Sequence, residues 1–259
     1  MNHRLIALEG VDNFRDFGDY PTRGGGRLKR RRLFRSAAHG RATDADLAVI
    51  GGLDLAVIVD LRRRNERLRD PTRRHLGFAG SVIENDTGGE ADDTWRAHLL
   101  SSDLSAASFR EFQLAYYRQA PFEPRHLDLF SRYFAALADI DTPILIHCAA
   151  GKDRTGLLAA LIHHLAGVHP DDMQADYLLT NHPDWMERRL PVVARVIEDI
   201  AGRAPSEAAV RTAMGVEAEY LRASFTAIAE RHGGTDAYLA QALGVDRELR
   251  ERLAAKLID

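Results

Sequence analysis

The apolar residues of this chain occur in short continuous runs and in longer runs with helical spacing. The short runs are bounded by glycine, proline or charged residues, a pattern typical of strands buried on both faces of a sheet. They predict strands at 28–35, 53–61, 82–83 and 144–146. The longer runs repeat apolar residues every three or four positions and predict helices. These are expected at 43–51, 109–119, 124–138, 157–167, 170–180, 185–201, 207–231, a short stretch from 235, and 246–257.

The order of these elements predicts the class of fold. Strands and helices alternate up to residue 167 and only helices follow. We therefore expect an α/β fold with a central, mostly parallel sheet flanked by helices, and a helical C-terminal part. A chain of 259 residues is long enough for one large domain or two small ones. We expect a single domain over 1–259, with an insertion or a mobile lid at about 84–120 and a helical extension at about 181–235.

The composition argues against several classes of protein. A single cysteine leaves no internal disulfide and suits a reducing compartment. No apolar run approaches the roughly 18 residues of a membrane span, and the N-terminus lacks a hydrophobic signal core. We therefore expect a cytoplasmic protein without stable membrane insertion, although export without a leader stays open. The net charge is −3, so the 32 arginines are balanced and indicate a solvated surface rather than nucleic-acid binding.

Residues 144–162 predict a strand, a tight loop and a helix, and the loop contains residues suited to phosphate chemistry. Such a loop directs successive backbone N–H groups and the positive end of the helix dipole at one point, which suits an anion. Gly151 permits the positive φ that a tight curl requires. Cys148 lies at the base of the loop, where these N–H groups favour its thiolate, the nucleophilic form. The backbone predicted to bind phosphate is that of Ala149, Ala150, Gly151 and Lys152.

Three side chains after the cysteine extend this chemistry. Arg154 has a planar fork that can hold two phosphate oxygens while charge redistributes, which a lysine cannot do. Lys152 adds positive charge, which favours substrates with extra phosphates such as phosphoinositides. Thr155 offers a hydroxyl that can hydrogen-bond the sulfur when a phosphocysteine is hydrolysed. Together these residues predict a phosphate site with a nucleophile at its base.

The run His147-Cys148-x-x-Gly-Lys-x-Arg-Thr-Gly156 resembles the signature loop of the cysteine-dependent protein tyrosine phosphatase superfamily. The stretches 13–18 and 34–37, and shorter patches towards the C-terminus, are similar to a bacterial branch of tyrosine and phosphoinositide phosphatases. The resemblance implies a protein tyrosine phosphatase-like fold and hydrolysis of phosphomonoesters through a phosphocysteine, with no metal ion or cofactor. Phosphotyrosine proteins are the implied substrates, with phosphoserine or phosphothreonine proteins and phosphoinositides as further candidates.

Hydrolysis also needs a carboxyl group that protonates the leaving oxygen and later deprotonates a water. Well-known tyrosine phosphatases carry this group on a separate upstream loop, but Asp153 lies inside the signature loop, as in the bacterial branch. We predict that Asp153 is both acid and base. The alternatives are that Asp153 only braces the loop through an arginine, or that the acid is one of the upstream residues Asp86, Asp92, Asp93 and Asp103.

Two further residues are predicted to support the loop. His147 precedes the cysteine and is expected to order the loop by hydrogen bonding. Asp60 ends a predicted strand and is expected to orient the loop backbone or Arg154, with direct chemistry as the alternative. Glu66 lies one helical turn after Arg62, so these two side chains are expected to pair.

Two other functions fit parts of this pattern. A catalytically silent module could bind phosphoproteins or phosphoinositides through the same loop, although binding alone needs no nucleophile. A sulfurtransferase of the rhodanese type also places a cysteine loop before a helix, but the run from Gly151 to Gly156 fits phosphate better. A metal site is not expected, because no cysteine or carboxylate completes a ligand set with His163, His164 and His169.

Overall fold

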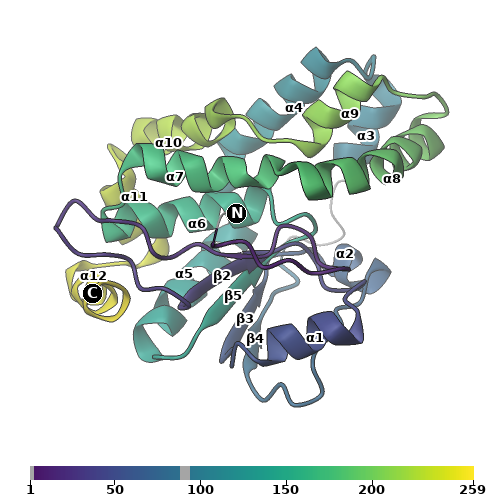
Figure 1. Cartoon of the computed structure of the whole chain (residues 1–259). Coiled ribbons are helices and arrows are strands. Elements are labelled where there is room, and N and C mark those ends of the chain that lie inside the picture. Colours follow the sequence, from purple (N-terminus) through teal and green to yellow (C-terminus); the bar gives the residue numbers. More distant parts are fainter. Residues whose placement is uncertain (1–2, 88–93) are drawn as a thin grey trace.

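A computed structural model describes residues 3–87 and 94–259 (Figure 1). Its sheet has the strand order β1-β2-β5-β3-β4. The strands are β1 (Arg15–Asp16), β2 (Leu33–Ser36), β3 (Val57–Asp60), β4 (Ser81–Ile83) and β5 (Ile144–His147). Strands β2, β5, β3 and β4 run parallel, and β1 pairs antiparallel with β2 at one edge. The predicted α/β fold with a mostly parallel sheet is confirmed, and β5, which leads into the phosphate loop, is its central strand.

Helices account for most of the remaining described chain. They are α1 (Asp44–Gly51), α2 (Arg64–Arg69), α3 (Thr94–Ser101), α4 (Ala106–Gln119), α5 (Pro124–Asp139), α6 (Asp153–Ala166), α7 (Pro170–Leu178), α8 (Pro183–Ala201), α9 (Glu207–Met214), α10 (Ala218–His232), α11 (Thr235–Leu243) and α12 (Arg247–Leu257). Short 3₁₀ turns follow α4 and α7, at Ala120–Phe122 and Leu179–Asn181. None of the helices in the described ranges is long and apolar enough to cross a membrane.

The clearest end signals in the sequence are confirmed. Thr43 caps α1 by accepting the backbone N–H of Asp46, whose carboxylate accepts the Thr43 N–H in return. Helix α6 ends at Gly167, which adopts the left-handed conformation with φ of 75°. Two predicted strands are shorter than expected: the strand predicted at 28–35 is β2, and the strand predicted at 53–61 is β3. Strand β3 begins four residues later than predicted because Asp54, with φ of 54°, belongs to the preceding turn.

The single helix predicted over 207–231 is wrong, because the chain forms α9 and α10 with a break between them. Gly215 is extended there, with φ of −81° and ψ of 179°. Asn181 fixes the break by binding both backbone groups of Val216, through Oδ1 to the N–H and through Nδ2 to the carbonyl, each at 2.8 Å. The break therefore depends on a residue 35 positions before Val216, which helical periodicity does not register.

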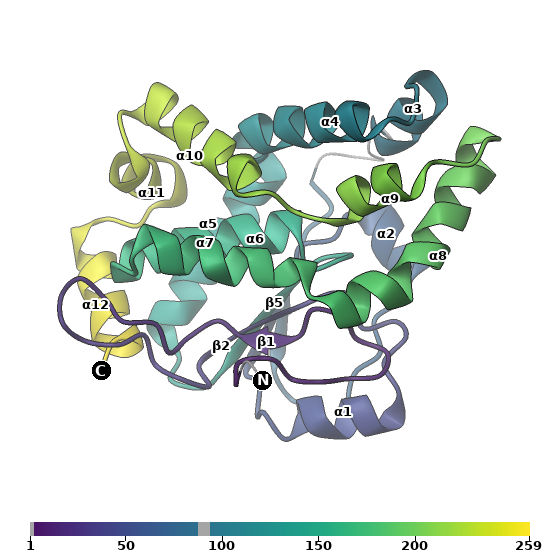
Figure 2. The same cartoon turned by 45° about the horizontal axis from the view of Figure 1, so that its top comes forward.

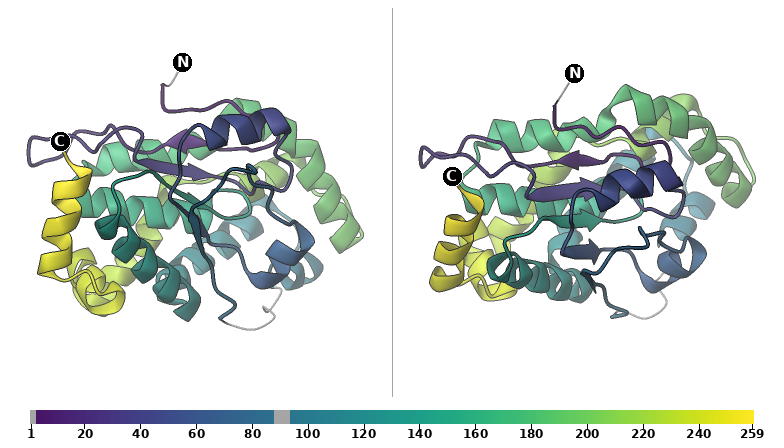
Figure 3. Two further views of the ribbon diagram at one scale, coloured as in Figure 1. Left: turned by 90° about the horizontal axis from the view of Figure 1, so that it is seen from below. Right: turned by 60° about the horizontal axis from the view of Figure 1, so that its bottom comes forward.

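The sheet separates two apolar clusters. Phe34, Ile58 and Leu145 face the cluster that contains α1. The alternate residues of the same strands face the cluster that contains α5 and α6, as the two-residue period of a strand requires. Figure 3 shows α1 and α5 on opposite sides of the sheet. The strands are thus buried on both faces, which explains their continuous apolar sequence.

A third apolar cluster joins helices that are far apart in sequence. Helices α3, α4, α8 and α9 share it and gather on one side of the molecule (Figure 2). Its buried members are Leu99, Leu104, Phe109, Ile197, Ala209, Val210 and Ala213. The predicted insertion at 84–120 and the predicted extension at 181–235 both contribute to this cluster, although residues 88–93 lie outside the described chain.

Candidate active site

The loop between β5 and α6 lies at the carboxyl end of the central strand. It curls through Gly151, whose φ is 65°. A Cβ at this position would come within 2.5 Å of the Ser36 carbonyl group, so only glycine fits against the end of β2. Gly156 is similarly confined, because a Cβ there would lie 2.8 Å from the Tyr177 ring. Both glycines of the signature run are required by close approach of other segments.

The carbonyl groups of the loop are held from outside. Asn13 donates its side-chain amide to the carbonyls of Ala150 at 3.3 Å and Gly151 at 2.9 Å. Arg35 donates to the Gly151 carbonyl at 3.0 Å. With the carbonyls turned outward, the N–H groups are free to face the loop interior, and an anion can accept from them. Among the described residues, no acceptor is hydrogen-bonded to the backbone N–H of Ala149, Ala150, Gly151 or Lys152.

A buried ion cluster stands behind these contacts. Arg15 and Arg35 both reach the Asp176 carboxylate, at 3.1 and 2.8 Å, and all three side chains are almost fully buried. Burial alone would raise the pKa of Asp176, but the two arginines hold it below the usual range. Arg15 also donates to the Asn13 side chain. The stretches 13–18 and 34–37 thus brace the phosphate loop, a role that the sequence did not indicate.

Cys148 lies at the base of the loop and is 2% exposed. It follows β5 directly, so its backbone is fixed by the central strand. Thr155, in the first turn of α6, is fully buried, and its hydroxyl has no hydrogen-bond partner within the described residues. A buried hydroxyl without a partner is costly. Its predicted bond to the sulfur or to a bound phosphate would supply that partner.

Arg154 is clamped by Glu66. Its guanidinium forms two bonds to that carboxylate, of 2.5 and 2.8 Å, and a third to the Leu61 carbonyl at 3.1 Å. Burial by itself would lower the pKa of Arg154, but the Glu66 charge raises it well above the usual value. The predicted pair of Arg62 with Glu66 is wrong. Glu66 turns instead to Arg154, across 88 residues of sequence, and so fixes the predicted phosphate-binding arginine.

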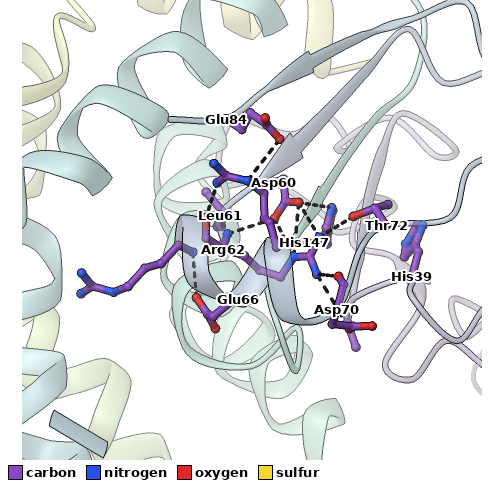
Figure 4. Close-up of polar contacts among 12 residues, drawn as sticks. His39, Asp60, Leu61, Arg62, Glu66, Asp70, Thr72, Glu84 and His147 are labelled. Carbon is purple, nitrogen blue, oxygen red and sulfur yellow. Dashed lines mark hydrogen bonds and ion pairs between the residues drawn. The ribbon is translucent and has the colours of Figure 1, made fainter. Parts of the chain in front are cut away.

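Asp60 forms an ion pair with Arg62 (Figure 4). The expected partner Arg154 pairs with Glu66 instead. The Arg62 backbone N–H, Nε and Nη2 donate to the Asp60 carboxylate at 2.8–3.2 Å. His147 lies beside it, with Nε2 at 3.6 Å, and stacks on His39 at 5.1 Å between ring centroids. Burial would raise the pKa of Asp60, but the His147 ring and Arg62 hold it below the usual range. Asp60 and Arg62 therefore form a permanent buried pair next to the loop.

The Lys152 ammonium points to the helical cluster. It donates to the carbonyls of Ala213 at 2.9 Å and Gly215 at 3.3 Å, at the C-terminal end of α9. Such carbonyls carry the negative end of a helix dipole and favour a cation. The side chain is 7% exposed, and Nζ also lies 3.4 Å from Asp153. Lys152 thus ties the loop to the break after α9.

Asp153 is the first residue of α6 and lies at the edge of a cavity. Its side chain is 23% exposed, and Tyr117 donates a hydrogen bond of 2.8 Å to its Oδ1. The predicted alternatives are placed differently. Asp86 pairs with Arg67 at the surface, and Asp103 accepts the Ser105 N–H at the start of α4. Asp92 and Asp93 lie outside the described residues.

Two cavities adjoin the loop, on either side of Lys152. The larger, of about 400 Å³, lies beside Asp153 and Arg154 and has half-buried aromatic walls from α3 and α4. These walls are Trp95, Phe112 and Tyr116. The smaller, of about 190 Å³, lies beside Asn13, and α8 and α9 form part of its wall. Ala149 and Ala150 line both cavities, so a ligand on the loop could extend into either.

A parallel-stranded α/β fold with a cysteine loop and its arginine at the end of the central strand defines the cysteine-dependent phosphatase superfamily, as the signature residues predicted. A family model described as the tyrosine phosphatase family matches residues 6–259. The chain belongs to this family. Because the family is one of enzymes, the prediction of phosphoester hydrolysis is confirmed at this level.

Three bacterial relatives agree with this assignment. A putative tyrosine-protein phosphatase of Cupriavidus necator is 33% identical over 93% of this chain and 85% of its own length. The triple specificity protein phosphatase PtpB of Mycobacterium tuberculosis is 31% identical over 97% of this chain and 98% of its own. A tyrosine-protein phosphatase of Nostoc commune is 28% identical over 86% and 73%. The bacterial branch predicted from the sequence is thereby confirmed.

Proposed function

We propose that this chain hydrolyses phosphomonoesters through a phosphocysteine formed on Cys148. The observation that carries the proposal is the orientation of the loop. Asn13 and Arg35 bind its carbonyls from outside, while no acceptor among the described residues is bonded to the N–H groups of residues 149–152. Those N–H groups and the clamped Arg154 supply donors for phosphate oxygens, so the charge that develops on phosphorus ligands is stabilised without further rearrangement.

The reaction takes two displacements at phosphorus. In the first, the Cys148 sulfur forms a bond to phosphorus, and the bond to the leaving oxygen breaks with its electron pair on that oxygen. Asp153 gives this oxygen a proton. In the second, Asp153 takes a proton from a water whose oxygen attacks phosphorus, and the S–P bond breaks with its electron pair on sulfur. Thr155, with its unpartnered hydroxyl, stabilises the departing thiolate.

The proposed substrates are phosphotyrosine proteins, with phosphoserine or phosphothreonine proteins and phosphoinositides as further members of the same range. The aromatic walls of the larger cavity support a phenyl ring there, because aromatic pairs gain stability beyond simple burial. The wider range is supported by the relative whose name states triple specificity. The Lys152 ammonium is bonded to the carbonyls of Ala213 and Gly215. It can bind an additional phosphate of a substrate only after these bonds break.

The first experiment measures phosphate release in EDTA from a phosphotyrosine peptide, a phosphoserine peptide and mono- and polyphosphorylated inositides. Wild type is expected to turn over, with the order of rates giving the substrate class, and Cys148→Ser is expected to lose turnover completely while still binding phosphate. Binding without turnover by the wild type would contradict the proposal and favour a silent phosphate-binding module. Release of thiocyanate from thiosulfate and cyanide would instead favour a sulfurtransferase.

We also propose that the enzyme works in the cytoplasm. The support is its single, catalytic cysteine, which a reducing compartment keeps as a free thiol. Fractionation of cells that express the chain should recover it with cytoplasmic markers. Recovery from the culture medium of intact cells would contradict this location.

A further inference from the structure

Two buried tyrosines form a row of hydroxyl groups that ends at Asp153. Tyr117, on α4, donates to Asp153 Oδ1 at 2.8 Å. Its hydroxyl oxygen lies 2.6 Å from that of Tyr177, on α7. Both side chains are buried, at 0% and 1% exposure, so water does not compete for these bonds. Three helices, α4, α6 and α7, therefore meet at one carboxyl group.

The direction of the two hydrogen bonds follows from the number of protons. Each tyrosine carries one hydroxyl proton. Tyr117 uses its proton for Asp153, so the bond between the tyrosines must be donated by Tyr177. Burial raises the pKa of both tyrosines well above the usual value, and the negative charge of Asp153 is the second cause. Neither tyrosine gives up its proton in the working range of pH.

The contacts fall on only one oxygen of the carboxyl group. Oδ1 accepts from Tyr117 and lies 3.4 Å from the Lys152 ammonium. Oδ2 has no such partner among the described residues. Asp153 borders the larger cavity, which is also lined by Ala149, Ala150 and Arg154 of the loop, so a leaving group that enters this cavity would lie beside its carboxyl group. The two oxygens are therefore unequal, one fixed by protein and one available to substrate.

We propose that Tyr117, backed by Tyr177, is a positioning residue that holds Oδ1 so that Oδ2 carries the catalytic proton. This inference rests on the proposed function of Asp153. Oδ2 gives its proton to the leaving oxygen as the P–O electron pair moves there, and later receives a proton from the attacking water. Tyr117 keeps its own proton throughout, and its hydrogen bond stabilises the carboxylate left after the first transfer.

The test compares leaving groups of unequal quality. Phenyl phosphate needs protonation of its leaving oxygen, whereas p-nitrophenyl phosphate depends on it far less because its phenolate is stable. For Tyr117→Phe we expect kcat/KM on phenyl phosphate to fall at least about tenfold, since a positioned acid contributes about 10²–10⁴-fold. On p-nitrophenyl phosphate the fall should stay within about threefold. Tyr177→Phe should show the same split, but smaller.

Tyr238→Phe provides a matched control. Tyr238 is also fully buried and donates one hydrogen bond of 2.6 Å, to the Pro121 carbonyl. Neither Tyr238 nor Pro121 belongs to the phosphate loop. Replacement of Tyr238 removes an equivalent bond and should leave the ratio of the two substrates unchanged. In an Asp153→Asn background, Tyr117→Phe should add no further split, because the two changes act through one proton.

The outcomes separate this inference from the proposed function. If Tyr117→Phe lowers kcat/KM equally on both substrates, or leaves their ratio unchanged as Tyr238→Phe should, Tyr117 is structural only and the positioning role is overturned. If the split persists in the Asp153→Asn background, Tyr117 acts on another group and the inference also fails. Wild type that turns over neither substrate would instead remove the proposed function itself.

Discussion

Asp60 and Asp153 lie on neighbouring elements of the same site, but their carboxylates meet different partners. Asp60, at the end of β3, is fully buried and accepts three donor groups of Arg62. Asp153, at the start of α6, is partly exposed; Tyr117 donates to its Oδ1 at 2.8 Å, and the Lys152 ammonium lies 3.4 Å from the same oxygen. The His147 ring and Arg62 hold the pKa of Asp60 below its usual range against the effect of burial, whereas Oδ2 of Asp153 has no hydrogen-bond or ion-pair partner among the described residues. The two surroundings differ although the residue type is the same, and they support a structural role for Asp60 and the proposed chemical role for Asp153.

The largest expected effect tests the chemical half of this comparison. Asp153→Asn keeps an oxygen for the Tyr117 hydrogen bond but cannot release a proton. We expect kcat/KM on phenyl phosphate to fall by about 10²–10⁴-fold. Phosphate release measures this fall, and the Cys148→Ser variant gives the blank rate that is subtracted. Activity within about threefold of wild type would place the acid elsewhere.

The second prediction tests the structural half. Asp60→Ala leaves the Arg62 guanidinium buried without its main partner, which costs about 3–5 kcal/mol. Urea unfolding followed by circular dichroism measures this loss. Asp141→Ala is the control, because Asp141 is 81% exposed and pairs with Lys256 at the surface. Its loss of stability should be far smaller than that of Asp60→Ala, because solvent screens an exposed ion pair. Equal losses for the two variants would contradict a permanent structural pair at Asp60.

Glu66 extends the comparison to a third carboxylate, with a smaller effect that depends on pH. Burial would raise the pKa of Glu66, but Arg154 lowers it from 4.5 to about 2. Because the folded pKa lies below the unfolded one, this contribution is complete above about pH 4.5 and is lost as pH falls towards 2. It amounts to at most about 3 kcal/mol at neutral pH.

Glu66→Gln should therefore destabilise the protein at pH 7 and narrow its difference from wild type at pH 3, in urea unfolding at both values. The exposed pair of Glu251 with Arg247 gives the control, since Glu251→Gln should change stability by less than about 1 kcal/mol at either pH. A difference between Glu66→Gln and wild type that stays constant with pH would exclude the charged clamp on Arg154.

Sequence alone predicted the parts of the site that are local. Cys148 to Arg154 lie in one strand-loop-helix segment, so their order along the chain is enough to bring them together at the end of β5. Strands β2 to β5 and α6 were predicted from their apolar runs, because burial on both faces leaves a continuous run of apolar residues, whereas the short edge strand β1 was not predicted. The acid role of Asp153 came from its place within that segment and stays a proposal.

What sequence did not predict depends on contacts between distant segments. Glu66 was matched with its helical neighbour Arg62, but each found a better partner, in Arg154 and Asp60. Tyr117 fell on a predicted helix, yet nothing in its neighbourhood showed that α4 would deliver its hydroxyl to α6. The break at Gly215 was likewise set by Asn181 from another segment. Periodicity reports which face is buried, not what it is buried against.

The bracing of the phosphate loop has a consequence for the order of folding. Asn13 reaches Gly151 across 138 residues, and Arg15 reaches Asp176 across 161. Contacts between segments so far apart close large loops and are slow to form. During synthesis, Asn13 and Arg15 cannot form these two contacts until the chain has been made as far as α7. Helical content is therefore an early property of this protein, and a competent phosphate site is a late one.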